Sequence, residues 1–129
     1  MRALVDTNVI IDAVGGLAPA VKDLEQAVRS EWVGYSAITR LEVLCYPNLT
    51  GDEECALRTV LGELVEVQVM PAIIDRAVQI RRACRIKTPD AIIAATALEC
   101  AAILITRNTK DFLAVHELEI RHPSEWGEG

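Results

Sequence analysis

The chain has 129 residues, of which 51% are hydrophobic, and its formal net charge is −6. This length supports one hydrophobic core and is too short for two ordinary domains, so we expect residues 1–129 to form a single domain. The negative charge argues against a protein that holds nucleic acid through an overall positive field, although it does not exclude a nuclease whose acids bind cations. The N-terminus lacks the uninterrupted core of a secretory signal, and no apolar run reaches the roughly 18 residues of a membrane span, which predicts a cytoplasmic protein.

Short apolar or β-branched runs alternate with helical patterns along the chain. Strands are predicted near residues 2–5, 32–36, 66–70, 102–105 and 118–122. Helices are predicted over residues 18–30, 37–46, 52–64 and 73–86, and an alanine-rich helix follows residue 88. Such alternation is typical of a three-layer α/β domain with a central, mostly parallel, five-stranded sheet flanked by helices. The runs at 2–5 and 102–105 are continuously apolar, so we expect them to be central strands, with the 66–70 strand more peripheral.

The four cysteines indicate neither a zinc site nor a disulfide framework. They contain no Cys-x-x-Cys pair, and only two histidines could join them as soft ligands. All four lie within or beside apolar helical patterns, so we expect small buried thiols at Cys45, Cys55, Cys84 and Cys100.

Four acidic residues lie on four separate segments, each where a strand has just ended or a helix has just begun: Asp6, Glu42, Asp90 and Asp111. The carboxyl ends of parallel strands meet at one edge of an α/β sheet, so acids that follow two neighbouring central strands should converge there. Converging acids repel one another, and a hard divalent cation with oxygen ligands relieves this repulsion. The pattern therefore predicts a magnesium or manganese site.

Asp90 also has a purely structural interpretation. It stands in the first turn of a helix for which Thr88 is the predicted N-cap and Pro89 the first residue, so it can simply complement the helix dipole. The helix behind it is nearly uncharged and apolar all round, which predicts a buried helix. Burial of that helix would place Asp90 at the inner edge of the sheet.

The other acids differ in how easily a structural role explains them. Glu42 can be an ordinary outward-facing residue of a helix capped by Ser36, and Asp111 can belong to a capping arrangement with Asn108. Asp6 has no basic residue near it in the sequence, which favours a functional role. Three further acids are expected on helix surfaces, namely Asp12, Asp75 and Glu99.

Four motifs contain these acids and together span nearly the whole chain. They are Asp6-Thr7-Asn8-Val9-Ile10-Ile11-Asp12, Thr39-Arg40-Leu41-Glu42-Val43, Thr88-Pro89-Asp90-Ala91-Ile92-Ile93-Ala94-Ala95-Thr96-Ala97 and Thr106-Arg107-Asn108-Thr109-Lys110-Asp111-Phe112. Their order and spacing resemble the PIN-domain ribonucleases, and in particular the VapC-like toxins of type II toxin–antitoxin modules. The resemblance implies a metal-dependent endoribonuclease that cleaves RNA phosphodiesters, works as a homodimer and is silenced by a small antitoxin.

The same resemblance implies roles for individual residues. It assigns metal binding and catalysis to Asp6, Glu42, Asp90 and Asp111, with magnesium or manganese as the cofactor. Thr7, Asn8 and Thr106 are expected to support these ligands. Asn108 is expected to do so as well. Some members of the family place an acid where this chain has Asn108, which bears on whether Asp111 is a direct ligand.

Basic and apolar residues suggest where partners bind. The candidate RNA contacts are Arg81, Arg82, Arg85, Lys87, Arg107 and Lys110, although such residues can equally form a solvated surface. A homodimer and an apolar groove for an antitoxin helix are predicted from Leu17, Val21, Leu24, Val60, Leu61 and Leu64, which can instead fill the core.

Three other functions also use acids at strand ends. A haloacid-dehalogenase-like phosphatase needs a second acid two positions after Asp6, where this chain has Asn8. A receiver-type signalling domain has an acidic pair near its start, where Asp6 stands alone. A PIN-like metal-binding module without nuclease activity stays open as an alternative, and an activity assay separates it from a nuclease.

Overall fold

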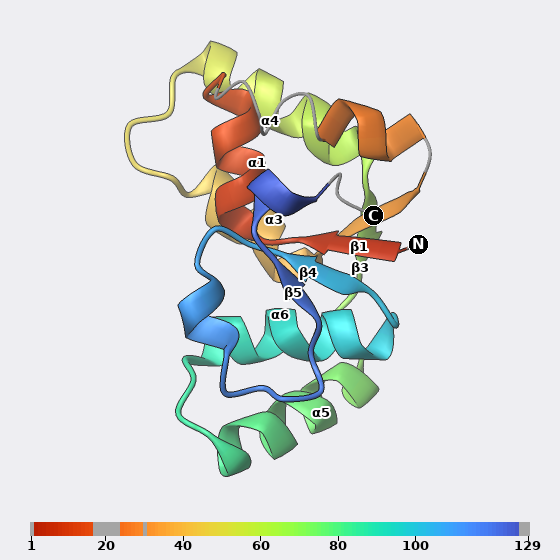
Figure 1. Ribbon diagram of the computed structural model, residues 1–129. Helices are drawn as coiled ribbons and strands as arrows, with labels where there is room; N and C mark the ends of the chain where they lie inside the picture. The colour runs from red at the N-terminus through yellow and green to blue at the C-terminus, as the bar shows by residue number, and fades with distance from the viewer. Residues whose placement is uncertain (1, 17–23, 30, 127–129) are drawn as a thin grey trace.

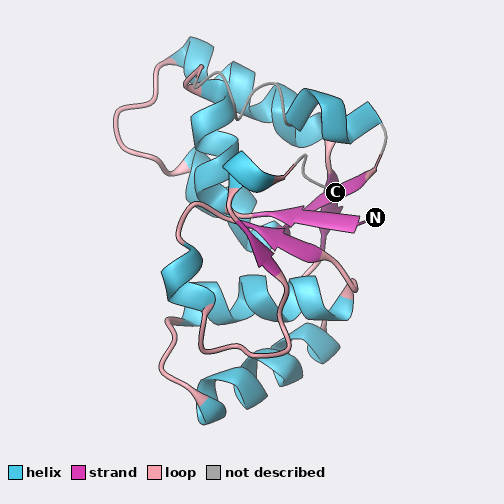
Figure 2. Cartoon of the chain, in the orientation of Figure 1, coloured by secondary structure: helices cyan, strands magenta, loops and turns pink. Residues whose placement is uncertain are grey.

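The computed structural model describes residues 2–16, 24–29 and 31–126, which form a five-stranded sheet with helices on both faces (Figures 1 and 2). The strands are β1 Arg2–Val5, β2 Trp32–Ser36, β3 Val65–Val67, β4 Ile103–Ile105 and β5 Ile120–Arg121. They lie in the order β3-β2-β1-β4-β5, and every neighbouring pair is parallel. The predicted fold class is confirmed. So are the central positions of β1 and β4 and the edge position of β3.

Helices form the two outer layers. Helices α1 Thr7–Val14 and α4 Gly51–Glu63 cover one face of the sheet, and α5 Pro71–Ala83 and α6 Thr88–Glu99 cover the other (Figure 1). Helix α3 Ala37–Leu44 packs against α1 and α4 and also reaches α6. Residues 24–29 are helical, and two short 3-10 helices, η1 Thr109–Phe112 and η2 Pro123–Glu125, flank β5.

The alternation of side chains along the strands divides the core between the two faces. Val5 and Ile105 belong to a cluster beneath α1 and α4, whereas Leu4 and Leu104 belong to a cluster with α5 and α6. Successive residues of a strand point to opposite faces, so a strand covered on both sides must be apolar throughout. This requirement explains the unbroken apolar runs that mark β1 and β4 in the sequence.

Two strands run directly into helices at the carboxyl edge of the sheet. Asp6 follows the last residue of β1 and is the N-cap of α1. Ser36, the last residue of β2, is the N-cap of α3, and its Oγ accepts a hydrogen bond of 3.3 Å from the Ile38 amide, as predicted. Polar side chains therefore collect at this edge because strand ends and helix caps coincide there.

Several element boundaries differ from the prediction. Strand β3 ends at Val67 instead of near residue 70, because Met70 is already the N-cap of α5 and Pro71 its first residue. Proline suits the first helical turn, where its missing amide hydrogen leaves no bond unmade. The helix predicted to run to residue 86 ends at Ala83, and the last strand is limited to Ile120–Arg121. The helix predicted over residues 18–30 lies partly outside the described residues.

The expected cap of α6 and the expected burial of the thiols are wrong. Lys87, and not Thr88, is the N-cap of α6, and no side chain caps this helix end. Cys45 and Cys55 are exposed, because Cys45 is the C-cap of α3 and Cys55 lies on the solvent side of α4. The other two cysteines, Cys84 and Cys100, are half-buried, and all four thiols are free.

The apolar residues predicted to form a docking groove belong mainly to the core where the structure describes them. Leu24, Leu61 and Leu64 are buried, and Val60 packs against the same cluster. Leu24, Val60 and Leu64 also line a small pocket of about 210 Å³. Leu17 and Val21 lie outside the described residues. Within the described part of the chain, none of the helices has the length and apolar character that crossing a bilayer requires.

Candidate active site

Asp6 is a buried carboxylate at the junction of β1 and α1, with only 5% of its surface exposed. Its Oδ1 accepts a 2.8 Å hydrogen bond from the Thr7 amide, and its Oδ2 accepts bonds from Thr106 Oγ1 at 2.8 Å and Asn8 Nδ2 at 3.1 Å. Burial raises the pKa of Asp6, its hydrogen-bond donors oppose this effect, and the nearby charge of Glu42 adds to it. The pKa of Asp6 is raised overall, because the hydrogen-bond donors only partly offset the cost of burying its charge.

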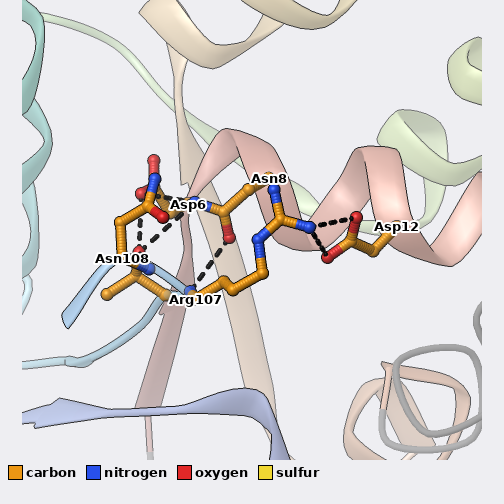
Figure 3. Close-up of polar contacts among 6 residues, drawn as sticks. Asp6, Asn8, Asp12, Arg107 and Asn108 are labelled. Atoms are coloured by element: carbon orange, nitrogen blue, oxygen red, sulfur yellow. Dashed lines mark hydrogen bonds and ion pairs between the residues drawn. The ribbon is translucent and has the colours of Figure 1, made fainter.

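The first turn of α1 and the loop after β4 together supply the polar groups that hold Asp6 (Figure 3). Thr106 is fully buried, and its Oγ1 also accepts a hydrogen bond of 3.1 Å from the Asn108 amide. Asn8 joins α1 to this loop, because its Oδ1 accepts a 3.0 Å bond from the Arg107 amide. A phosphatase of the haloacid-dehalogenase type would need an acid at position 8, and here the residue at that position holds Asp6 in place.

Glu42 reaches the same edge from α3. Its Oε1 accepts a hydrogen bond of 2.6 Å from Thr7 Oγ1, which also lies 3.3 Å from Thr39 Oγ1. Thr39 is fully buried and was not singled out from the sequence as a site residue. Its position three residues before Glu42 places it on the same helix face, and this spacing was the available signal.

Asp90 lies half-buried in the first turn of α6, close enough to the other acids for their charges to act on it. Its pKa is raised from 3.8 to about 6, first by burial and then by the negative charges of Asp6, Asp111 and Glu42, while the charge of Lys87 opposes the rise. Helix α6 itself is largely buried, as its apolar sequence predicted. The fold therefore brings four acids from four segments into mutual electrostatic range.

Asp111 lies on η1 and is exposed. Its amide donates a hydrogen bond of 3.1 Å to the Asn108 carbonyl oxygen, but the Asn108 side chain makes no cap bond to this helix. The predicted capping arrangement is therefore wrong as far as the Asn108 side chain is concerned. What remains is a carboxylate at the solvent side of the site whose charge reaches Asp90.

The chemistry of this cluster suits a hard divalent cation. Its donors are carboxylate, hydroxyl and amide oxygens, the ligand types that magnesium and manganese prefer. In the part of the chain that the structure describes, none of the four acids takes part in an ion pair. Across the same residues, no three acidic, histidine or cysteine side chains are drawn together tightly enough to form a ready-made metal site. The cluster thus has the right donors and an uncompensated charge, but not a closed coordination shell.

The basic residues predicted to contact RNA lie in two places. Arg81, Arg85 and Lys87 line a surface pocket of about 440 Å³ at the junction of α5 and α6. Arg82 is exposed and lines another pocket together with Arg81. The Arg81 side chain is partly committed there, because its Nε donates a 3.1 Å hydrogen bond to the Ile86 carbonyl oxygen. Lys110 is exposed on η1.

Arg107 is held by an acid that the sequence did not suggest as its partner. Its Nη1 lies 2.9 Å from both carboxylate oxygens of Asp12, whose side chain is only 13% exposed. The prediction that Asp12 is an ordinary surface acid is therefore wrong. The two other acids expected on helix surfaces are less enclosed: Asp75 is exposed, and Glu99 pairs with Arg76.

A second polar cluster lies on β2, β3 and α3. Glu66 accepts hydrogen bonds from Arg40 Nε, from Tyr35 Oη at 3.1 Å and from Gln68 Nε2 at 2.8 Å. Arg40 Nη2 also donates to Tyr35 Oη at 3.2 Å. The hydrogen bond from Arg40 is the main reason that the pKa of Glu66 is lowered.

The fold and the acidic cluster define a class, namely α/β domains that gather carboxylates at the carboxyl edge of a parallel sheet. The PIN domain family model matches residues 3–118, and the chain belongs to this family. No curated protein matches the chain at a significant level.

Solved structures of similar fold include a toxin-antitoxin complex from Klebsiella pneumoniae, with 35% identity, a TM-score of 0.80 and coverage of 94% of this chain and 97% of that one. FitAcB from Neisseria gonorrhoeae is 26% identical, with a TM-score of 0.72 and coverage of 94% and 97%. VapBC2 from Rickettsia felis, solved with a DNA fragment from its promoter, is 19% identical with a TM-score of 0.83 and coverage of 95% and 98%, which supports the fold alone.

Proposed function

We propose that this protein is the toxin of a toxin–antitoxin pair and a divalent-metal-dependent endoribonuclease. The observation that carries the proposal is the convergence of three carboxylates on a fourth, Asp90, without an arginine or lysine in an ion pair with any of them among the described residues. Carboxylates kept together against their own repulsion indicate a site that gains a cation in use. Membership of the PIN domain family and the likeness to a toxin-antitoxin complex from Klebsiella pneumoniae support the same function.

In this proposal Asp6, Glu42, Asp90 and Asp111 hold magnesium or manganese. The bound cation supplies Lewis-acid stabilisation of the charge that develops on the phosphodiester during cleavage. Thr106 and Asn8 fix the Asp6 carboxylate by donating to Oδ2, and Thr7 orients Glu42. These hydrogen bonds set the positions of the ligands before RNA arrives, which reduces the reorganisation that catalysis requires.

The RNA backbone would approach from the junction of α5 and α6. Arg85 and Lys87 line the pocket at this junction, and Lys87 is the N-cap of the helix that carries Asp90. The positive charge of Lys87 acts on Asp90, since it opposes the rise of the Asp90 pKa. Phosphates flanking the cleaved bond would pair with this basic rim, together with Arg82 and Lys110.

The test of this function uses purified protein and a mixed-sequence single-stranded RNA. We expect cleavage in magnesium or manganese, loss of cleavage in EDTA and recovery when the metal is restored in excess. Asp6→Asn is the test variant. Asparagine is also a good N-cap, so the change should leave α1 intact while lowering the cleavage rate at least about 100-fold. Cleavage that persists in EDTA and survives Asp6→Asn would contradict the metal mechanism.

We also propose a homodimer and a cognate antitoxin. Met70 at the N-cap of α5 and Ile74 and Val78 within the helix recur every four residues and are exposed, which gives an apolar stripe suited to a second copy of the chain. Ile74→Asp should shift the protein to a monomer in sedimentation velocity at micromolar concentration, with Arg58→Gln on α4 as a surface control. A wild-type protein that sediments as a monomer would contradict the dimer, without bearing on the antitoxin.

A further inference from the structure

Arg107 connects the loop after β4 to α1 through two separate contacts (Figure 3). Its backbone amide donates to Asn8 Oδ1 at 3.0 Å, and its guanidinium Nη1 lies 2.9 Å from both oxygens of Asp12. Asn8 and Asp12 are four residues apart, so they lie on one face of the helix, one turn after the other. One loop residue is thus held at its backbone and at the end of its side chain by the same helix face.

The loop held in this way carries the groups that define the acidic site. Thr106, the residue before Arg107, donates to Asp6 Oδ2 at 2.8 Å, and Asn8 donates to the same oxygen at 3.1 Å. The chain after Arg107 leads through Asn108 into η1, where Asp111 lies. A shift of this loop away from α1 would therefore move the donor to one acid and the position of another at the same time.

We propose that Arg107, paired with Asp12, is a positioning residue of the metal site and not an RNA contact. The inference rests on the proposed function, because it takes the loop to serve acids that bind a cation. The charge of Arg107 is already paired with the Asp12 carboxylate, whose side chain is largely removed from solvent, whereas the Arg107 side chain is half exposed. The ion pair keeps the loop against α1, so that Thr106 and Asp111 stay in the arrangement that the cation requires.

The two roles make opposite predictions for Asp12. If Arg107 binds RNA phosphates, Asp12→Asn frees the guanidinium and removes a negative charge, so RNA should bind more tightly. If Arg107 positions the loop, Asp12→Asn and Arg107→Gln break the same contact and should have the same effect. That effect should appear in metal binding, since neither residue is proposed as a ligand of the cation.

The experiment compares wild type, Arg107→Gln, Asp12→Asn and the double variant in two measurements. The first is the magnesium concentration at which half of the metal-induced rise in melting temperature is reached. We expect each single change to raise this concentration about 10-fold, the usual scale for groups that orient ligands, and the double variant to be no worse than the single ones. The second measurement is binding of a mixed-sequence RNA by metal-free protein in EDTA, which we expect to change less than about 2-fold in every variant.

Control variants distinguish loss of the Arg107–Asp12 contact from loss of any surface ion pair and from general unfolding. Glu54→Gln and Arg58→Gln break an exposed ion pair of 3.0 Å on α4, which contributes no side chain to the site, and should leave the magnesium midpoint unchanged. Arg107→Lys keeps a charged donor that can still reach Asp12, so its midpoint should fall between those of wild type and Arg107→Gln. Intermediate rescue of this kind requires folded protein and so excludes general unfolding as the cause.

Weaker RNA binding by Arg107→Gln together with tighter binding by Asp12→Asn would overturn the proposal, as would an unchanged magnesium midpoint or additive effects in the double variant. RNA cleavage by the wild type is measured in parallel. If the variants show the predicted midpoint shifts but the wild-type protein does not cleave RNA, the nuclease function is refuted and the positioning role stays in place.

Discussion

Glu66 on strand β3 and Asp90 on helix α6 are both carboxylates, and their pKa values are displaced in opposite directions. The pKa of Glu66 lies below its ordinary value, mainly because Arg40 donates a hydrogen bond to it, with Tyr35 and Gln68 as further donors. The pKa of Asp90 is raised to about 6 by burial and by three neighbouring acids. The guanidinium of Arg40 lowers the pKa of Glu66. Burial and the accumulated negative charge raise the pKa of Asp90.

The two clusters therefore contribute to stability in opposite pH ranges. A lowered carboxylate pKa stabilises the folded state above the ordinary value of 4.5, and this contribution is lost as the pH falls through the folded pKa of Glu66. A raised carboxylate pKa favours the folded state below the ordinary value of 3.8, and this contribution is lost as the pH rises through about 6 for Asp90. At neutral pH the Glu66 cluster stabilises the contact between α3 and the sheet. At the same pH the acidic site lowers the stability of the folded protein until a cation binds.

The largest effect that distinguishes the clusters should come from Thr106→Val. This change keeps the shape of a fully buried side chain but removes the donor to Asp6 Oδ2 and the acceptor for the Asn108 amide. We expect a loss of about 2 kcal/mol in the free energy of unfolding, because the buried Asp6 carboxylate loses a donor and the Asn108 amide loses its acceptor. The hydrogen bond from Thr106 lowers the pKa of Asp6, so its removal raises that pKa further, and the loss should be greater at about pH 7 than at about pH 4.

Tyr35→Phe is the matched control in the other cluster. It also removes a hydroxyl from a buried side chain, but Arg40 and Glu66 remain bonded to each other, so we expect a loss of only about 0.5 kcal/mol. Urea denaturation of both variants provides the measurement, and Thr106→Ser should recover most of the lost stability. Equal losses in the two variants, or a loss for Thr106→Val that does not change with pH, would show that Asp6 does not depend on this donor.

The sequence predicted the parts of this structure that follow from local patterns. The unbroken apolar runs predicted the central strands, and the strand-end position of Asp6 predicted its place at the carboxyl edge. Element ends were less accurate, because Pro71 fits a first helical turn as well as it ends a strand. The exposure of Cys45 and Cys55 was missed because an apolar neighbourhood in sequence does not tell which face of a helix meets the core.

Contacts between distant segments could not be predicted in the same way. The pair of Asp12 and Arg107 joins residues 95 positions apart, and the pair of Arg40 and Glu66 joins residues 26 positions apart. Neither residue type nor spacing shows which loop will lie against which helix, since this depends on how the strands are ordered in the sheet. The resemblance to a family supplied the order of the four acids, but it did not supply the ion pair that holds the loop between them.

Asp90→Asn gives the smaller and more discriminating effect, because its sign differs from that of most substitutions. Replacing ionised Asp90 removes the cost of burying its charge and then the repulsion from Asp6, Asp111 and Glu42. A pKa raised from 3.8 to about 6 corresponds to about 3 kcal/mol by linkage. Because the side chain is only half-buried, solvent screening reduces this value, and the lost interaction with the helix dipole reduces it again. We expect the metal-free variant to be more stable than wild type by about 1 kcal/mol at about pH 7, with the advantage lost near pH 4, where wild-type Asp90 is protonated in the folded state.

Magnesium should reverse this order. A cation that binds only the folded protein stabilises it in proportion to the logarithm of its concentration over the dissociation constant, and a variant that lacks one carboxylate ligand gains less. Melting curves of wild type and Asp90→Asn, in EDTA and in millimolar magnesium, measure both effects, with Asp75→Asn on the exposed face of α5 as a control that should change neither. If Asp90 only complements the dipole of α6, Asp90→Asn will be the less stable protein in EDTA and will gain as much from magnesium as wild type does. That outcome would remove Asp90 from the metal site and leave three carboxylates to hold the cation.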